Sequence, residues 1–291
     1  MRDFFMAEKA RTCLIRTMGA WTAIVLAGNR PGENGFAESQ GVSAKALISV
    51  GGEPMLGRVL KALLAAPSVG AIVVLAQDPQ MLLGGALSWT AGEPRIGTAP
   101  AGDGISASVA GLAGSAAAPW PILVTTADHA LLSPEMIETF IAASGTADSS
   151  FGLVERRVVE QAYPATKRTW IKFRGGQYSG ANLFALRTPA AHKALVFWAR
   201  VERDRKKALR LLLFFGLAVF LRAFTRTIGL DAAVAKVGRD VGLTLKAVRL
   251  PFAEAAIDVD KPADLVLVEE ILAGRAGLAP GASPFKDPPP G

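Results

Sequence analysis

The sequence predicts an α/β fold, a Rossmann-like three-layer sandwich with a mostly parallel sheet between two layers of helices. Apolar runs of the length of a buried strand occur at 23–27, 70–77 and 120–126. Helical patterns lie between and after them, most clearly at 54–66 and 134–143. Strands that alternate with helices favour parallel pairing through crossover helices.

The rest of the chain fits the same layout. Ser133 followed by Pro134 is a suitable N-cap and first residue for the helix 134–143. The further expected elements are a short strand at 94–98, a helix from Ser106, extended runs at 151–160 and 168–174, a strand at 178–186, a helix at 231–241, a strand at 243–250 and a helix at 262–273.

The expected organisation is one domain with short ends. With 291 residues, of which 51% are hydrophobic, the chain can bury a large core. We expect a loosely ordered leader over 1–20 and one domain over 21–273 with a helical insert at about 193–230. Residues 274–291 are rich in Pro and Gly and are expected to be disordered.

Charge and composition narrow the class of function. The net charge of +7 suits an anionic partner. Basic residues are not interleaved with aromatic residues in a recognised module, which argues against nucleic-acid binding. Cys13 is the single cysteine, so an intramolecular disulfide is excluded, and His129 and His192 alone do not make the usual zinc site.

The most informative stretch runs from Ala23 to Leu56, where a strand enters a long loop that a lysine closes. Gly28 ends the strand, and a glycine there lets backbone N–H groups come close to a phosphate. Lys45 at the far end of the loop adds a point charge for a polyphosphate. The spacing matches neither G-x-x-x-x-G-K-[ST] nor G-x-G-x-x-G. Taken alone, the stretch can also be read as an ordinary glycine turn with a solvated lysine.

These residues resemble a known family. Leu-Ala-Gly, a glycine-bearing loop, Lys45 and then Gly-Gly-x-Pro-Met-Leu are similar to the signature of MobA-like NTP transferases, the molybdenum-cofactor guanylyltransferase type. The resemblance covers about residues 21–272 and implies a nucleotide-diphospho-sugar transferase (GT-A-like) fold. It implies an enzyme that moves a nucleoside monophosphate from an NTP, GTP or CTP above all, to a phosphorylated sugar, polyol or lipid-precursor acceptor and releases pyrophosphate.

Aspartates at two strand ends are the expected metal ligands. Asp128 follows the strand 120–126, and in such sheets ligands bind at the carboxyl ends of the strands. Asp258 opens D-V-D-K-P-A-D-L, which resembles the motif whose leading aspartate helps hold the metal in the family; Asp260 is a second candidate. Carboxylates and phosphates suit Mg²⁺, the expected cofactor. Asp264 reads as an acid in the first turn of a helix.

The resemblance also implies which residues contact the substrates. Lys45 and Asp128 are expected to be catalytic. The expected nucleotide-binding set is Leu26, Ala27, Gly28, Asn29, Arg30, Lys45, Ser106 and Ser108. The expected acceptor-binding set is His129, Lys172, Gly180 and Asn182, with Lys167 and Arg168 as further basic candidates. The loop departs from the family pattern, since Arg30 is displaced, and an ordinary N-cap is the alternative for the serines.

The segment 193–230 has two interpretations. Its apolar part, Leu211 to Leu221, is about half the ~20 residues that a membrane-spanning helix needs. One interpretation is a helix that is buried or at a subunit interface. The other is an interfacial helix that brings 205–225, with its flanking basic residues, to an anionic membrane. Either way we expect a cytoplasmic protein, in the second case peripheral to the inner membrane.

Two other functions remain as alternatives. A glycosyltransferase of similar fold would use a nucleotide-sugar donor, but its usual D-x-D follows a strand in the middle of the chain, whereas here D-x-D is at Asp258. A non-catalytic membrane-associated nucleotide-binding protein would instead depend on the apolar segment Leu211 to Leu221.

Overall fold

A computed structural model describes residues 20–28, 35–102, 104–203 and 228–275. Several sequence predictions fall outside these residues: the leader up to residue 19, Asn29 and Arg30 of the loop, the segment 205–225, and the tail from residue 276.

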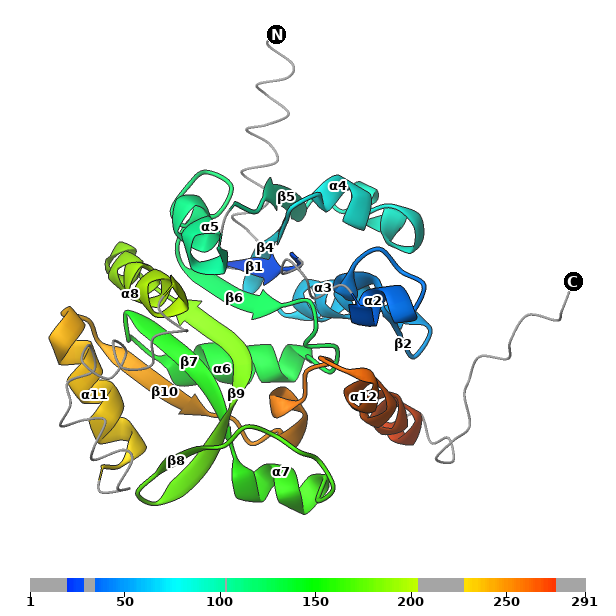
Figure 1. The fold of residues 1–291 in the computed structure, drawn as a ribbon. Helices are drawn as coiled ribbons and strands as arrows, with labels where there is room; N and C mark the ends of the chain where they lie inside the picture. The colour runs from blue at the N-terminus through cyan, green and yellow to red at the C-terminus, as the bar shows by residue number, and fades with distance from the viewer. Residues whose placement is uncertain (1–19, 29–34, 103, 204–227, 276–291) are drawn as a thin grey trace, which may run out of the picture.

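The described residues form a central sheet with helices on both faces (Figure 1). The strands are β1 (Trp21–Leu26), β2 (Ser49–Val50), β3 (Glu53–Pro54), β4 (Val69–Ala76), β5 (Ile96–Pro100), β6 (Ile122–Thr126), β7 (Ser149–Glu155), β8 (Ile171–Phe173), β9 (Gly176–Leu186) and β10 (Leu245–Arg249). The α-helices are α2 (Gly35–Ser39), α3 (Met55–Ala65), α4 (Pro79–Leu82), α5 (Ile105–Leu112), α6 (Pro134–Ser144), α7 (Arg156–Ala162), α8 (His192–Arg203), α11 (Leu230–Val241) and α12 (Pro262–Arg275). Short 3₁₀ helices are η1 (Lys45–Leu47), η2 (Gly85–Gly92), η3 (Pro189–Ala191) and η4 (Ala253–Ala256).

The central sheet has the strand order β10-β7-β9-β6-β1-β4-β5, and β8 pairs with β9. β1 lies between β4 and β6 and pairs with both in parallel, and β10 pairs with β7 in parallel. β9 is antiparallel to β6, β7 and β8. The sheet is therefore mostly parallel, as the alternation of strands and helices predicts, and a long antiparallel strand joins its two parallel parts.

Alternate residues of the strands pack into two separate hydrophobic cores, because successive side chains point to opposite faces of the sheet. Ala23 and Val25 of β1 pack on one face with α3 and α6, and that core includes Phe140. Ile24 faces the other way and packs with α5 and α8, through Val109 and other apolar residues. The predicted three-layer sandwich is confirmed by these two apolar faces.

A small hairpin of β2 and β3 follows the loop that carries Lys45. Gly51 and Gly52 connect the two strands, and both have positive φ, at 59° and 80°. This is the combination that a tight two-residue hairpin requires and that glycine adopts without steric cost. Val50 then packs against Ile271 of α12. The hairpin thereby joins the N-terminal loop to the C-terminal helix.

One predicted element is wrong in type. The extended run predicted over 151–160 ends at Glu155, and the chain continues as the helix α7. Two features favour the helix: Arg156 and Glu160, four residues apart, form an ion pair at 2.6 Å, and Val159 is buried. Val154, Val158 and Val159 favour a strand by intrinsic preference, and these contacts override that preference.

Candidate active site

The site lies at the carboxyl ends of the parallel strands. The N–H of Ala27, just after β1, donates to the carbonyl of Leu75 in β4 at 2.9 Å. The N–H of Ala127, just after β6, donates to the carbonyl of Leu26 at 2.9 Å. These bonds bring Gly28 and Asp128 to one edge of the sheet, where such folds bind their ligands.

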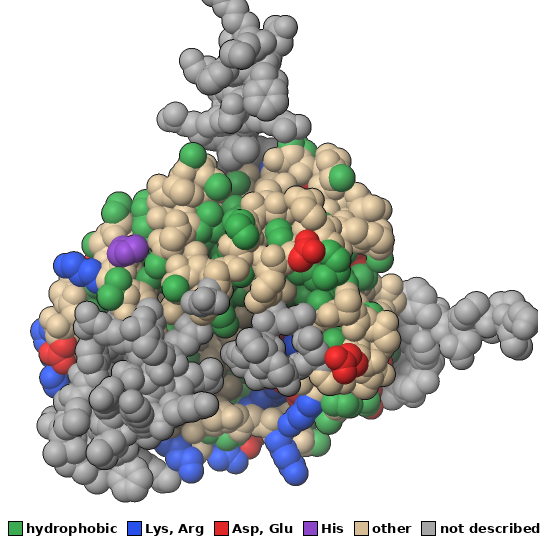
Figure 2. All heavy atoms as spheres, turned by 45° about the horizontal axis from the view of Figure 1, so that its top comes forward, with side chains coloured by type: hydrophobic (Ala, Val, Ile, Leu, Met, Phe, Trp, Pro, Cys, Tyr) green, Lys and Arg blue, Asp and Glu red, His purple; other side chains and the backbone are tan. Residues whose placement is uncertain are grey.

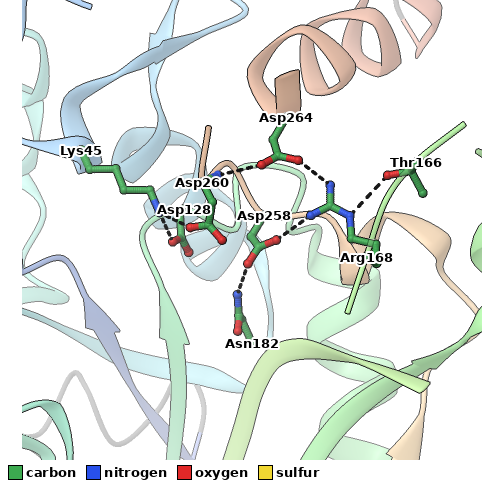
Figure 3. Close-up of polar contacts among 8 residues, drawn as sticks. All are labelled: Lys45, Asp128, Thr166, Arg168, Asn182, Asp258, Asp260 and Asp264. Atoms are coloured by element: carbon green, nitrogen blue, oxygen red, sulfur yellow. Dashed lines mark hydrogen bonds and ion pairs between the residues drawn. The ribbon is translucent and has the colours of Figure 1, made fainter. Parts of the chain in front are cut away.

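Lys45 reaches this edge from η1. Its neighbours Ala46 and Ile48 are buried, which fixes the backbone of the short helix against the core. The ammonium Nζ lies 2.7 Å from Oδ2 of Asp128 and 2.5 Å from Oδ1 of Asp260 (Figure 3). The structure thus joins three of the predicted site residues that are up to 215 positions apart in the sequence.

Asp258 and Asp260 come from an extended segment between η4 and α12. Ile257 and Val259 are fully buried, so the two aspartates point to the opposite side, toward the sheet edge. The N–H of Val259 donates to the backbone carbonyl of Asp128 at 3.1 Å and holds the segment against the end of β6. The alternating I-D-V-D pattern therefore presents its acids next to Asp128.

Asn182 lies where β9 separates from β6. β9 pairs with β6 only as far as Phe184, and its register with β7 shifts between Phe151 and Leu153. Asn182 has φ of 47°, a left-handed conformation that asparagine tolerates better than most residues. Its Nδ2 donates to Oδ2 of Asp258 at 3.3 Å. The residue predicted to bind the acceptor thus contacts a predicted metal ligand.

Arg168 has partners that the sequence did not indicate. Its guanidinium contacts Asp258 at 2.9 Å and Asp264 at 3.1 Å, and its Nε donates to Thr166 Oγ1 at 3.3 Å. Asp264 is in the first turn of α12, as predicted, and its second oxygen accepts the N–H of Asp260 at 3.2 Å. The sequence contains one indication of such a contact: several acids lie close together in D-V-D-K-P-A-D and need a cation. No feature of the sequence identifies Arg168 as that cation.

Burial and neighbouring charges shift the pKa values of Asp258 and Lys45 in directions that matter for the chemistry. Burial, with the charges of Asp260 and Asp128, raises the pKa of Asp258 to about 6, although Arg168 acts to lower it. Burial acts to lower the pKa of Lys45, but Asp128 and Asp260 outweigh it and the net shift is upward. At neutral pH the lysine is therefore a cation and Asp258 is mostly ionised, within a group of carboxylates that benefits from added positive charge.

Ser106 and Ser108 lie at the start of α5, at the same edge of the sheet. The N–H of Ala101 donates to the carbonyl of Ala76 at 2.7 Å, which places the preceding loop beside the end of β4. The Ser108 hydroxyl accepts the N–H of Gly102 at 2.9 Å and donates to the carbonyl of Gly104 at 2.8 Å. Ser106 is buried. Contacts of these serines with a nucleotide stay a prediction.

His129 follows Asp128 in the chain and is buried. Its side chain is only 1% exposed, so the ring is turned into the protein and does not face the open edge where an acceptor would bind. Neither ring nitrogen has a hydrogen-bond partner among the described residues. Burial lowers the pKa of His129 to about 4, against the opposing effect of Asp128, so the ring is neutral at pH 7. Direct acceptor binding by His129 does not fit this position.

Lys172 lies in β8 and Gly180 lies in β9. Lys172 is opposite Gln177, which is five residues from Asn182, or roughly 16 Å along a strand. It lines a separate open cavity of about 390 Å³ with Arg156, Glu160 and other residues of β7, α7, β8 and β9. Figure 2 shows Lys and Arg side chains along the lower edge, on the side where these elements lie in Figure 1. Gly180 is exposed two residues from Asn182.

The described part of the chain has neither a metal-binding group of side chains nor a helix that could cross a membrane. In residues 20–28, 35–102, 104–203 and 228–275, no group of three or more His, Cys, Asp or Glu side chains is placed so that it could hold a metal ion. No helix within the same ranges has the length and hydropathy to cross a membrane.

Comparison with known proteins identifies the family. The model of the MobA-like NTP transferase domain matches residues 23–199. A transferase from Thermus thermophilus, described as hypothetical, is 30% identical with a TM-score of 0.70 over 84% of this chain and 98% of its own. Among curated proteins nothing matches.

Two solved structures share the fold at low identity. A CMP:2-keto-3-deoxy-manno-octonic acid synthetase in complex with CTP is 13% identical, with a TM-score of 0.54, over 88% of this chain and 100% of its own. The 4-diphosphocytidyl-2C-methyl-D-erythritol synthase from Anaerococcus prevotii is also 13% identical, with a TM-score of 0.55, over 89% and 98%.

The fold and the family match define this chain as a nucleotidyltransferase. More narrowly, it belongs to the family of MobA-like NTP transferase domains, as the resemblance of Leu26-Ala27-Gly28, Lys45 and the later Gly-Gly-x-Pro-Met-Leu predicts.

Proposed function

We propose that this nucleotidyltransferase moves a nucleoside monophosphate from an Mg²⁺-bound NTP, GTP or CTP above all, to a phosphorylated small molecule and releases pyrophosphate. The observation that carries the proposal is the group of Lys45, Asp128, Asp258 and Asp260 at the carboxyl edge of the sheet. It combines a lysine cation with three carboxylates, which suits a charged substrate that arrives with a divalent cation.

Lys45 is the residue we assign to the phosphates. Its ammonium lies between Asp128 and Asp260, at the edge where a triphosphate would lie. A phosphate oxygen can replace one of these carboxylate partners at little electrostatic cost. The lysine then offsets the negative charge that grows on the departing pyrophosphate, and such preorganised stabilisation is usually the largest contribution to catalysis.

The aspartates fit a magnesium ion. Asp128 has one carboxylate oxygen, Oδ1, that is buried and has no hydrogen-bond partner among the described residues. Mg²⁺ in proteins is usually held by one or two carboxylates together with substrate phosphates, so a complete protein cage is not required. Asp128 and Asp258 are the residues we assign to it, with Asp260 as a further candidate. When bound, the ion would neutralise phosphate charge.

The acceptor needs to be positioned more than activated. A phosphate monoester is already an anion at neutral pH, so its oxygen can attack the α-phosphorus without a general base. Gly180 leaves open space beside Asn182 in β9, and we assign this side of the site to the acceptor. Lys172 is too far along the strand to contact an acceptor phosphate at Asp258 unless the acceptor is long.

The test is pyrophosphate release with each of the four NTPs, each combined with a panel of sugar, polyol and lipid-precursor phosphates. The proposal expects release with at least one pair, in the presence of Mg²⁺. It expects that Lys45→Met lowers the rate ~10²–10³-fold, as removal of a preorganised charge does.

The matched control is Lys236→Met, which removes an exposed lysine of α11 that pairs only with Asp240 among the described residues. Its rate should equal that of the wild type. The proposal would be contradicted if no pair releases pyrophosphate and calorimetry detects no binding of any Mg-NTP. Release of free nucleotide from a nucleotide-sugar instead would favour the glycosyltransferase alternative.

A further inference from the structure

Arg168 is a buried cation that the proposed chemistry does not use. Its side chain is 8% exposed, and it lies in the segment between α7 and β8, far in sequence from the aspartates it contacts. A buried charge is costly unless it is paired, so the surrounding carboxylates are required partners. The planar guanidinium can contact two carboxylates at once, which a lysine ammonium does less precisely.

The two carboxylates lie on either side of the turn that carries Asp260. Arg168 contacts Asp258 before this turn at 2.9 Å and Asp264 after it at 3.1 Å (Figure 3). One guanidinium therefore fixes the separation between the two ends of the turn. Asp264 also fixes the backbone at Asp260, because its other oxygen accepts the N–H of Asp260 at 3.2 Å.

The same contacts orient Asp258. Its Oδ1 accepts from Arg168 and its Oδ2 accepts from Asn182 at 3.3 Å, so the carboxylate is held from two sides. Each carboxylate oxygen has a second lone pair, which leaves Asp258 able to bind a cation in a fixed direction. Arg168 also brings a positive charge to a place where three aspartates gather.

We propose that Arg168 is a positioning residue that holds Asp258 and the Asp260 turn in the geometry that binds the cation of the nucleotide. This inference rests on the proposed function, since it assumes that these aspartates receive a divalent cation with an NTP. It differs from the sequence-based interpretation of Arg168 as a ligand of the acceptor, because the guanidinium faces the aspartates and is buried among them.

The experiment uses the NTP that stabilises the wild type most against heat. It measures the half-saturating Mg²⁺ concentration, at which half of this thermal stabilisation is reached. Arg168→Met should raise this concentration about tenfold or more, the effect expected when a partner that orients a metal ligand is lost. Arg168→Lys should give a value between those of the wild type and of Arg168→Met, because the ammonium keeps the positive charge but loses the planar fork that spans Asp258 and Asp264. Arg157→Met, which removes an exposed arginine of α7 that pairs with Glu155 at 2.9 Å, should match the wild type.

A second variant keeps the test decisive if Arg168→Met does not fold. Asp264→Asn retains the size of the side chain and the Arg168–Asp258 pair, and it should raise the half-saturating Mg²⁺ concentration by a smaller factor. If neither Arg168→Lys nor Asp264→Asn changes that concentration, the positioning role is wrong while the proposed function stands. If the wild type shows no Mg²⁺-dependent stabilisation by any NTP, the proposed function fails and this inference fails with it.

Discussion

The two parts of the sheet contribute to the site in different ways. The part made of β6, β1, β4 and β5 is parallel, and it supplies Asp128 directly from a strand end, with Lys45 from the loop after β1. The part around β9, β7 and β10 supplies Asn182 from an irregular antiparallel strand, and Arg168 and Asp258 from the connections. The first part places its residues by regular topology, whereas the second depends on side-chain contacts and on the backbone bond from Val259 to Asp128. We therefore expect changes in the first part to affect the chemistry and changes in the second to affect the affinity for the cation.

Removal of divalent cations is expected to have the largest effect, because the proposed Mg²⁺ would contact aspartates from both parts. Chelation of divalent ions should abolish pyrophosphate release, and added Mg²⁺ should restore it, since the triphosphate charge is no longer offset once the ion is removed. The measurement is the rate before chelation, after chelation and after Mg²⁺ addition. A rate that survives chelation would show that the carboxylates serve another purpose.

Asp128→Asn should have the next largest effect. The substitution removes a carboxylate that would hold the proposed Mg²⁺ against the phosphates while it preserves the size of the side chain, and we expect the rate to fall ~10²–10³-fold at saturating Mg²⁺. Steady-state kinetics over a range of Mg²⁺ concentrations measures it. Full recovery at high Mg²⁺ would mean that Asp128 acts only through affinity, which would remove the difference between the two parts.

Within the second part, Asp258 and Asp260 are expected to differ in their effect on the affinity for Mg²⁺. Asp258 is held from two sides, whereas the Asp260 side chain is 60% exposed. Asp258→Asn should therefore raise the half-saturating Mg²⁺ concentration more than Asp260→Asn does, by about tenfold for Asp258. The measurement is the Mg²⁺ dependence of NTP-induced stabilisation. A larger effect for Asp260 would reverse their assigned roles.

The smallest expected effect is on the pH dependence of folding stability. His129 in the first part and Asp258 in the second change stability in opposite directions as the pH falls. The pKa of His129 is lowered from 6.5 to about 4, so its contribution to stability is lost as the pH falls from 6.5 toward 4. The pKa of Asp258 is raised from 3.8 to about 6, so its contribution is present at low pH and is lost as the pH rises through 6.

The corresponding variants should change the slope of the melting temperature against pH between 4 and 6.5 in opposite ways. His129→Leu should flatten the loss of stability at low pH, and Asp258→Asn should steepen it. Thermal melts across this range measure both slopes. Slopes that change in the same direction would contradict the assigned pKa shifts.

The sequence predicted the parallel part better than the antiparallel part, for a physical reason. Strands such as β1 and β6 read as continuous apolar runs because both of their faces are buried, and the residues directly after each strand necessarily lie at one edge of the sheet. Gly28 and Asp128 could therefore be assigned to that edge from the sequence.

The antiparallel part depends on contacts between distant residues that leave no local pattern. Arg168 lies 90 positions from Asp258, and neither its burial nor its two partners can be read from the segment R-T-W-I-K-F-R. His129 shows the opposite case: its position next to Asp128 suggested a ligand contact, but the chain turns its ring into the core.

The central claim is that the two parts together form a site for an Mg-NTP, and a thermal-shift screen of the four NTPs tests it most directly. With Mg²⁺ and an NTP at 100 times its dissociation constant, the protein should gain about 2.7 kcal/mol of stability. The gain should require Mg²⁺ and should be largely lost in Lys45→Met but not in Lys236→Met. An unchanged melting temperature with every NTP in the presence of Mg²⁺ would contradict the account.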